Sequence, residues 1–97
     1  MKDTKKKFKL GDVVMTNGLK TMIERETLVP QYIIKHLLTR HVTGDWGDVD
    51  DEDKQTNNDS VDNGNRLLSS YTVSGEKVWI ITEADRSTTT LLLPEEY

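Results

Sequence analysis

Cysteine is missing from this chain, and aromatic residues make up only 6% of it. Without cysteine the protein has no disulfide bridge, no thiolate zinc site and no thiol nucleophile. No apolar run approaches the roughly 20 residues that cross a bilayer. The lysines near the start are not followed by the apolar segment of a secretion signal. We therefore expect a cytoplasmic protein without membrane association.

Charged residues are abundant and unevenly placed. The 97 residues contain 13 Lys and Arg against 17 Asp and Glu, which gives a net charge of −4. A chain of this length forms one domain. We predict a single compact domain over residues 1–97, in which residues 1–7 are a flexible basic arm. Six acids lie between Asp45 and Asp53, so this later segment has the opposite charge.

The first half of the chain combines one short strand with helical spacing. Residues 12–16 are typical of a strand and end at the turn pair Asn17-Gly18. Residues 19–26 and 30–41 carry apolar side chains at intervals of three and four, which predicts two helices. Asp48 is expected to cap a third helix that begins near Val49. This helix is polar almost all round and has only Val49 and Val61 as apolar anchors, so its stability must come from elsewhere.

In the second half of the chain, apolar and polar residues alternate or form short apolar runs, as is typical of strands. Residues 66–73, 77–84 and 88–93 predict three strands joined by turns at residues 74–76 and 85–87. Both faces of the middle strand are apolar, because neighbouring side chains of a strand point to opposite faces. We predict an α+β fold, with a small antiparallel β-meander of three to four strands packed against two to three helices.

The composition of the acidic run makes it a candidate metal site, but the spacing of its carboxylates does not fit one. An EF-hand loop needs glycine at its sixth position and Glu at its twelfth. Counted from Asp48, these positions are occupied by Asp53 and Asp59. With two histidines and no thiols, a zinc site would need carboxylates to complete it. We expect neither a metal nor a cofactor.

Motifs of nucleophilic or nucleotide-dependent catalysis are missing from the sequence. His36 is expected in solvent, and His41 is expected at a helix end as a favourable cation. We predict no catalytic residue. One enzymatic alternative stays open, a metal-independent ribonuclease, although the net negative charge opposes RNA binding. Its residues would be Arg66, Tyr71, Lys77, Glu83, Asp85 and Arg86.

The acidic run has a further interpretation as a binding surface. Spaced carboxylates can present a phosphate-like field to the basic groove of a nucleic-acid enzyme, and tryptophan is a frequent interface anchor. The competing interpretation is that the acids cap a helix while Trp46 fills the core. The predicted partner-binding residues are Asp45, Trp46, Asp48, Asp50, Asp51 and Glu52. The alternative pocket consists of His41, Arg66, Tyr71, Trp79, Glu83, Asp85 and Arg86.

Several strings of the chain resemble a family of small bacterial proteins carried on plasmids and prophages, described as plasmid-related and uncharacterised. The most specific strings are Gly-Asp-Trp-Gly-Asp at residues 44–48 and Trp-x-Ile-Thr-Glu-Ala-Asp-Arg-Ser at residues 79–87. Further similar stretches lie at residues 8–11, 66–71 and 92–97, so the resemblance covers nearly the whole chain. Residues 56–63 are richer in Asn than the corresponding helix of the family.

The resemblance implies a genetic context and no catalytic residue. Small acidic proteins of mobile elements often act against host defence, so we expect a non-enzymatic binding module of a mobile genetic element. Its expected role is an anti-CRISPR or anti-restriction inhibitor that binds a nucleic-acid-binding defence complex through its acidic surface. A toxin–antitoxin component or the ribonuclease is the alternative. Direct nucleic-acid contact is expected only weakly, from the lysine-rich N-terminus, and the oligomeric state is left open.

Overall fold

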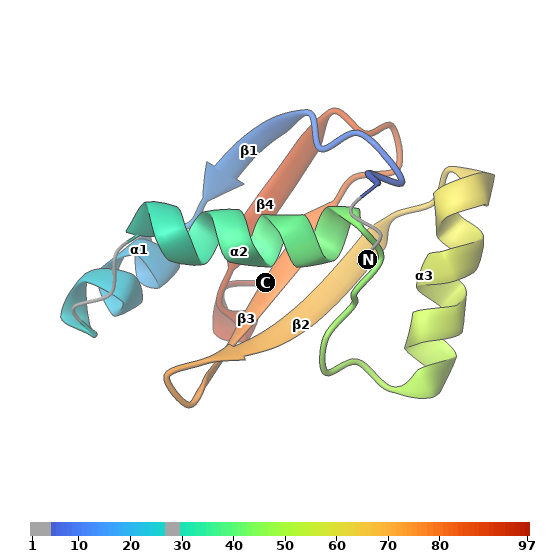
Figure 1. The fold of residues 1–97 in the computed structure, drawn as a ribbon. Helices are drawn as coiled ribbons and strands as arrows, with labels where there is room; N and C mark the ends of the chain where they lie inside the picture. The colour runs from blue at the N-terminus through green and yellow to red at the C-terminus, as the bar shows by residue number, and fades with distance from the viewer. Residues whose placement is uncertain (1–4, 27–29) are drawn as a thin grey trace.

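The computed structural model describes residues 5–26 and 30–97, which form a mixed four-stranded sheet with helices beside it (Figure 1). The elements in chain order are β1 (Asp12–Met15), α1 (Asn17–Arg25), α2 (Pro30–Val42), α3 (Asp51–Asn63), β2 (Leu67–Val73), β3 (Glu76–Thr82), β4 (Thr88–Leu92) and the 3-10 helix η1 (Pro94–Glu96). The predicted α+β class is confirmed. Within the described ranges no helix is both long enough and apolar enough to span a membrane.

The strands lie in the order β1-β4-β3-β2. β2, β3 and β4 form the predicted antiparallel meander, and β1 pairs with β4 in parallel. The turn between β2 and β3 consists of Ser74 and Gly75, whose φ angles are both positive, and such turns match the twist of paired strands. β1 and β2 are therefore the two edges of the sheet.

The apolar core lies between one face of the sheet and the helices α1 and α2 (Figure 1). Leu19, Met22 and Ile23 of α1 recur at helical spacing, and all three are buried. Pairing places alternate residues of neighbouring strands on the same face of the sheet. The strand register therefore gathers the sheet residues of the core on the face that the two helices cover. These residues are Tyr71, Val78, Ile80, Leu91 and, after β4, Leu93.

The pair Asn17-Gly18 was expected to form a turn, and this expectation is wrong. Both residues belong to the first turn of α1. The carboxylate of Glu96 accepts a hydrogen bond from the Thr16 hydroxyl at 2.5 Å and from the Gly18 N–H at 3.0 Å. A group from the other end of the chain therefore satisfies a free N–H of the helix start, which local sequence patterns could not indicate.

The third helix begins later than expected and is anchored by polar residues. Asp50, not Asp48, is its N-cap, and the Asp50 carboxylate accepts the Asp53 N–H at 2.8 Å. The buried residues of α3 are Asn57 and Ser60, so this helix is anchored by polar residues and its stability comes from elsewhere than its two valines, as expected. The helix ends at Gly64 with a φ of 74°, the left-handed conformation in which glycine is favoured.

The described part of the N-terminal segment is fixed to the helical layer. The Lys7 N–H donates to the Val42 carbonyl at 2.8 Å, at the end of α2. The Phe8 ring contacts His41 edge-on at 5.2 Å and stacks on Trp46 at 6.1 Å. Residues 1–4 of the expected flexible arm lie outside the described residues.

Candidate functional site

The free edge of β2 is closed by the loop before α3. Gly47 and Ser70 form a parallel β-bridge. The Ser70 N–H donates to the Trp46 carbonyl at 3.1 Å, and the Asp48 N–H donates to the Ser70 carbonyl at 2.6 Å. Two of the outward backbone groups of this edge are thereby satisfied.

Gly47 is required for this close approach. Its φ is +75°, and a Cβ at this position would lie 2.0 Å from the Ser70 carbonyl oxygen and 2.6 Å from the Tyr71 ring. Backbone atoms cannot move aside as a flexible side chain can, so any larger residue would open the bridge. The glycine inside the Gly-Asp-Trp-Gly-Asp string therefore has a structural role.

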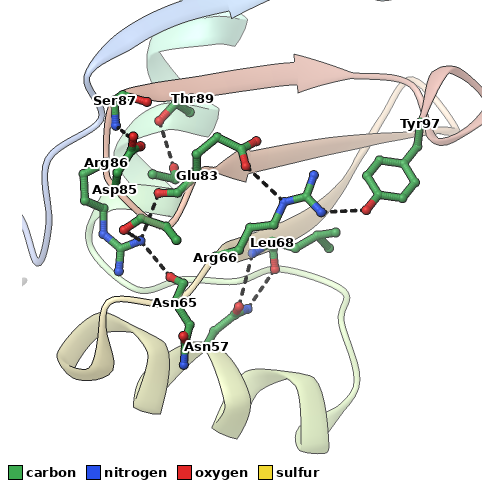
Figure 2. A network of polar contacts seen from close by, with 12 residues as sticks. Asn57, Asn65, Arg66, Leu68, Glu83, Asp85, Arg86, Ser87, Thr89 and Tyr97 are labelled. Carbon is green, nitrogen blue, oxygen red and sulfur yellow. Dashed lines mark hydrogen bonds and ion pairs between the residues drawn. The ribbon is translucent and has the colours of Figure 1, made fainter.

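The side chain of Asn57 continues the closure of the β2 edge. Its amide nitrogen donates to the Leu68 carbonyl at 2.7 Å, and its amide oxygen accepts the Leu68 N–H at 3.2 Å (Figure 2). A primary amide has the same donor and acceptor as a backbone peptide group. Asn57 thus substitutes for a neighbouring strand and attaches α3 to the sheet edge.

Arg86 attaches the C-terminal end of α3. Its guanidinium donates to the Ser60 carbonyl in the last turn of α3 at 2.8 Å and to the Asn65 carbonyl just beyond the helix at 2.7 Å. The same group reaches back to the Glu83 carbonyl at 3.1 Å (Figure 2). The negative end of the helix dipole favours a cation here. Arg86 therefore connects the β3–β4 turn to α3.

The solvent side of α3 is negatively charged. The helix contains five acids and one lysine, and its first turn consists of Asp51, Glu52 and Asp53, which the positive end of the helix dipole favours. At 3.6 residues per turn, four acids fall on the side opposite the buried Asn57 and Ser60. All four are exposed, and we call them the acidic face: Asp51, Glu52, Asp59 and Asp62. Among the described residues the ion pairs lie outside α3.

Asp45 and Asp48, two of the predicted partner-binding acids, are engaged within the protein. Asp45 pairs with the Arg40 guanidinium at 2.7 Å. Asp48 accepts hydrogen bonds from the Thr72 hydroxyl at 2.8 Å and from the Lys77 ammonium at 3.0 Å. The Thr72 hydroxyl, followed by Lys77, holds the pKa of Asp48 below its ordinary value. Both carboxylates thus help to fix the loop that closes the β2 edge.

Trp46 belongs to the core, so its predicted use as a surface anchor is wrong. Its side chain is 3% exposed and packs between the rings of Phe8 and His41. The indole N–H donates to the Asn58 side-chain oxygen at 2.9 Å, which adds another contact to α3. Tryptophan is buried with its N–H satisfied, as is usual for this residue. The alternative weighed from the sequence, a core tryptophan, is the one observed.

His41 is buried and neutral, which corrects its predicted role as a cation at the helix end. The Thr89 hydroxyl donates to the Leu10 carbonyl at 2.7 Å, so it accepts from Thr82 at 2.8 Å. Thr82 in turn accepts the Nε2 proton of His41 at 2.9 Å, and the Ser69 hydroxyl donates to Nδ1 at 2.5 Å. Burial, reinforced by the nearby positive charge of Arg86, lowers the pKa of His41 to about 3.

The residues of the alternative pocket are not brought together in one site. His41 and Tyr71 are fully buried on the face under α1 and α2, and the Tyr71 hydroxyl donates to the Asp45 carbonyl at 2.6 Å. Burial raises the pKa of Tyr71 above its ordinary value, which opposes proton transfer at neutral pH. Trp79 lies on the opposite face of the sheet. The ribonuclease set is divided in the same way, because it also includes Tyr71.

Arg66, Glu83 and Trp79 of that pocket form a cluster on the outer face. The Arg66 guanidinium lies 3.5 Å from the Glu83 carboxylate and donates to the Tyr97 hydroxyl at 2.6 Å (Figure 2). The Tyr97 ring also contacts Trp79 at 5.7 Å. The cluster holds the end of the chain over the sheet. Asp85 instead accepts the Ser87 N–H at 2.9 Å and shapes the turn.

Sequence reasoning missed Asn57, Asp59 and Asp62. The sequence signal for Asn57 was weak. Asn57, Ser60 and Val61 are spaced to lie on one side of a helix, but two of the three are polar, so they do not form an apolar stripe. Across the described ranges no three His, Asp or Glu side chains lie close enough together to hold a metal ion. In the comparisons with known proteins, no family model, curated protein or solved structure matches the chain.

Proposed function

We propose that the protein is a non-enzymatic binding module whose acidic face docks on a basic surface of a partner protein. The observation that carries the proposal is that α3 is held at its middle by Asn57 and at its C-terminal end by Arg86, while its outward carboxylates lie outside the intramolecular ion pairs of the described residues. Fixed charges lose little conformational entropy on binding, and complementary fields accelerate and orient docking.

The composition of α3 supports this proposal. Like charges three or four residues apart destabilise a helix. The buried contacts of α3 are polar rather than apolar. The first-turn acids are favoured by the helix dipole, but Asp59 and Asp62 lie three residues apart in the C-terminal half, so a helix that served only to cover the sheet edge would be more stable without this pair. The excess of carboxylates is therefore better explained by recognition of a positively charged partner than by folding.

The partner chemistry that fits best is the basic groove of a nucleic-acid-binding protein. Such grooves bind phosphates through Lys and Arg and would attract the acidic face in the same way. Occupation of the groove would exclude nucleic acid. In the genetic context implied by the resemblance, this activity would make the protein an anti-CRISPR or anti-restriction inhibitor of a defence complex.

The test reverses the charge of the acidic face. The triple variant Asp51→Lys, Glu52→Lys and Asp59→Lys should lose capture of the partner in affinity purification from a bacterium that carries the native element, as followed by mass spectrometry. Short duplex DNA should displace the partner from the wild-type protein, because both would occupy the same groove.

Matched variants separate loss of binding from loss of folding. Reversal of the exposed acids Asp12, Glu24 and Glu95, which lie outside α3, should leave capture intact. The milder set Asp51→Asn, Glu52→Gln and Asp59→Asn should weaken capture without placing cations at the helix start. Circular dichroism checks the fold of each variant. Undiminished capture by the folded triple variant would refute the proposal.

A further inference from the structure

The second edge of the sheet, β1, differs from β2 in its exposure. Val13 and Val14 are 43% and 47% exposed, although both are large apolar residues in a strand. Val13 pairs with Thr89, a buried residue, and so points to the face that α1 and α2 cover. Val14 points to the opposite face.

One row of backbone groups of β1 points away from the sheet. The Asp12 N–H donates to the Ser87 carbonyl at 2.9 Å, and the Thr16 N–H donates to the Leu91 carbonyl at 3.0 Å. Since backbone groups alternate in direction along a strand, the N–H and C=O groups of Val13 and Met15 point outward. The part of the chain that the structure describes forms no bridge to this edge.

A hollow with an apolar floor lies next to the segment that leads into this edge, and no residue of β1 itself lines it. It has a volume of about 480 Å³ and runs between α2 and the segment that leads into β1, where Leu10, Ile34 and Leu38 form its floor. A second hollow of about 600 Å³ continues it to Gly11, directly before β1. Both share Lys6 and Val42.

The rim of these hollows is positively charged. Their lining includes four lysines and no acid, in a protein whose net charge is −4. The lysines are Lys6, Lys7, Lys9 and Lys35. The segment that carries three of them is fixed, because Gly11 lies so close to the β3–β4 turn that a Cβ would be 2.3 Å from the Ser87 carbonyl oxygen.

We propose that β1 and this hollow bind an extended segment of a partner protein, with apolar residues at its centre and carboxylates at its ends. The segment adds a strand to the sheet through the outward groups of Val13 and Met15. Its central apolar side chains lie beside Val13 over the floor of the hollow, and its acids contact the lysines at the rim. This site is separate from the acidic face and does not depend on the function proposed for it.

The chemistry of the site favours this occupant over two others. A second copy of the chain would bring a second set of lysines against the first, and like charges repel. A single-stranded nucleic acid would satisfy the lysines but not the outward N–H and C=O row, which matches another extended peptide backbone. Only an extended acidic peptide uses the strand edge, the apolar floor and the lysines together.

The test uses a labelled synthetic peptide, acetyl-Asp-Glu-Val-Thr-Val-Glu-Asp-amide, and the full-length protein. Fluorescence anisotropy should show that it binds at least about tenfold more tightly than acetyl-Lys-Lys-Val-Thr-Val-Lys-Lys-amide. Amide NMR shifts should be concentrated in residues 10–15 and on α2. The backbone N–H groups of the bound peptide alternate between facing β1 and facing away from it. N-methylation of the residues that face β1 should therefore abolish binding, and N-methylation of the others should not.

Protein variants locate the site. Val13→Pro removes an N–H that points outward, which an edge strand tolerates, and should weaken binding about tenfold. Lys6→Glu with Lys35→Glu should weaken it by a similar factor, whereas Lys20→Glu on α1, outside the lining of either hollow, should not change it. The lysine variants keep the test valid even if Val13→Pro perturbs folding.

Four results would overturn the proposal. The first is the absence of measurable binding at about 1 mM peptide. The second is equal binding of the acidic and lysine peptides, and the third is displacement of the same NMR signals by oligothymidylate, which would assign the site to nucleic acid. The fourth is a molecular mass that doubles in light scattering as the protein concentration rises and falls back to the monomer mass in Val13→Pro. This result would assign the edge to a second copy.

Discussion

The two edges of the sheet differ in how far their outward backbone groups are covered. At β2 a backbone bridge, the Asn57 amide and the helix α3 cover the outward groups, whereas β1 presents two half-exposed valines and an open row of backbone groups. Proteins usually protect edge strands, because an open edge can pair with another chain. Among the described residues β2 is thus the protected edge, and β1 is the exposed edge for which a peptide ligand is proposed above.

The contrast also explains where the two strings that carry the resemblance described above are located. Gly47 supplies the backbone bridge to β2, and Arg86 holds the end of α3 with a φ of 61°, an unusual value for a residue with a side chain. The most distinctive residues of both strings therefore serve the closed edge. Their chemistry does not mark a catalytic centre.

The largest expected effect comes from breaking the bridge at the closed edge. Gly47→Ala should destabilise the protein by about 4 kcal/mol or more, because its Cβ would meet backbone atoms that cannot yield. Urea unfolding measures this change.

The matched control for this variant is Gly75→Ala in the β2–β3 turn. Gly75 has a φ of +80°, but a Cβ there would meet nothing within 4 Å. Its destabilisation should be about 1 kcal/mol, the cost of the left-handed conformation alone. Equal effects at the two glycines would show that the bridge contributes nothing.

The next effect is a loss of stability on acidification, due to the buried network that joins the two edges. The network runs from Ser69 of β2 through His41 to the Leu10 carbonyl before β1. The pKa of His41 falls from 6.5 to about 3 on folding, so its stabilisation is complete above pH 6.5 and disappears as the pH falls toward 3. Between pH 7 and pH 5 the loss should be about 2 kcal/mol.

Variants assign this pH dependence to one group. The pKa values of Asp48, Asp85 and Glu96 are also lowered, but carboxylates that titrate below their ordinary values lose their stabilisation mainly under pH 5. His41→Gln should remove most of the slope above pH 5 in unfolding measurements. His36→Gln, on the exposed side of α2, should preserve it. A slope unchanged in His41→Gln would contradict the assignment.

Removing the side-chain part of the edge closure should have an intermediate effect. Asn57→Ala leaves the Leu68 N–H and C=O without their partner, and we expect a destabilisation of about 2 kcal/mol. Hydrogen exchange should show faster exchange of the Leu68 amide. Asn63→Ala, at an exposed position on the same helix, is the control. Unchanged Leu68 protection would mean that the Asn57 side chain does not protect this part of the β2 edge.

The smallest effect is expected at the open edge. Val14→Lys should change the free energy of unfolding by less than about 0.5 kcal/mol, because the Val14 side chain is half exposed on an edge strand. Thermal unfolding at two protein concentrations measures it. A loss above about 1.5 kcal/mol would show that β1 is covered in solution, which would weaken the contrast between the edges.

Local patterns were a reliable guide wherever neighbouring residues decide the structure. The apolar spacing of α2 and the alternation of β2 to β4 depend on contacts between each element and one core, and both predictions agree with the structure. The start of α1 was missed because Glu96, at the other end of the chain, satisfies it. The anchoring of α3 was missed because Asn57 is buried for its hydrogen bonds and not for its apolar surface.

The candidate site was predicted only in outline. The charge of the acidic run could be read directly, and Asp51 and Glu52 remain in the acidic face. Asp45 and Asp48 could not be separated from them, because their partners Arg40 and Lys77 come from other elements. The burial of Trp46 and the neutrality of His41 likewise depend on groups brought together by folding.

The amino-acid sequence alone determined the α+β class, the hairpin turn and the negative charge of residues 45–62. These properties follow from periodicity, turn chemistry and composition, which act over a few residues. The tertiary structure decided which edge of the sheet is closed, which carboxylates form ion pairs within the described residues and which polar groups are buried. These properties depend on hydrogen bonds and charges between residues distant in sequence, whose energies exist only after the strands have paired.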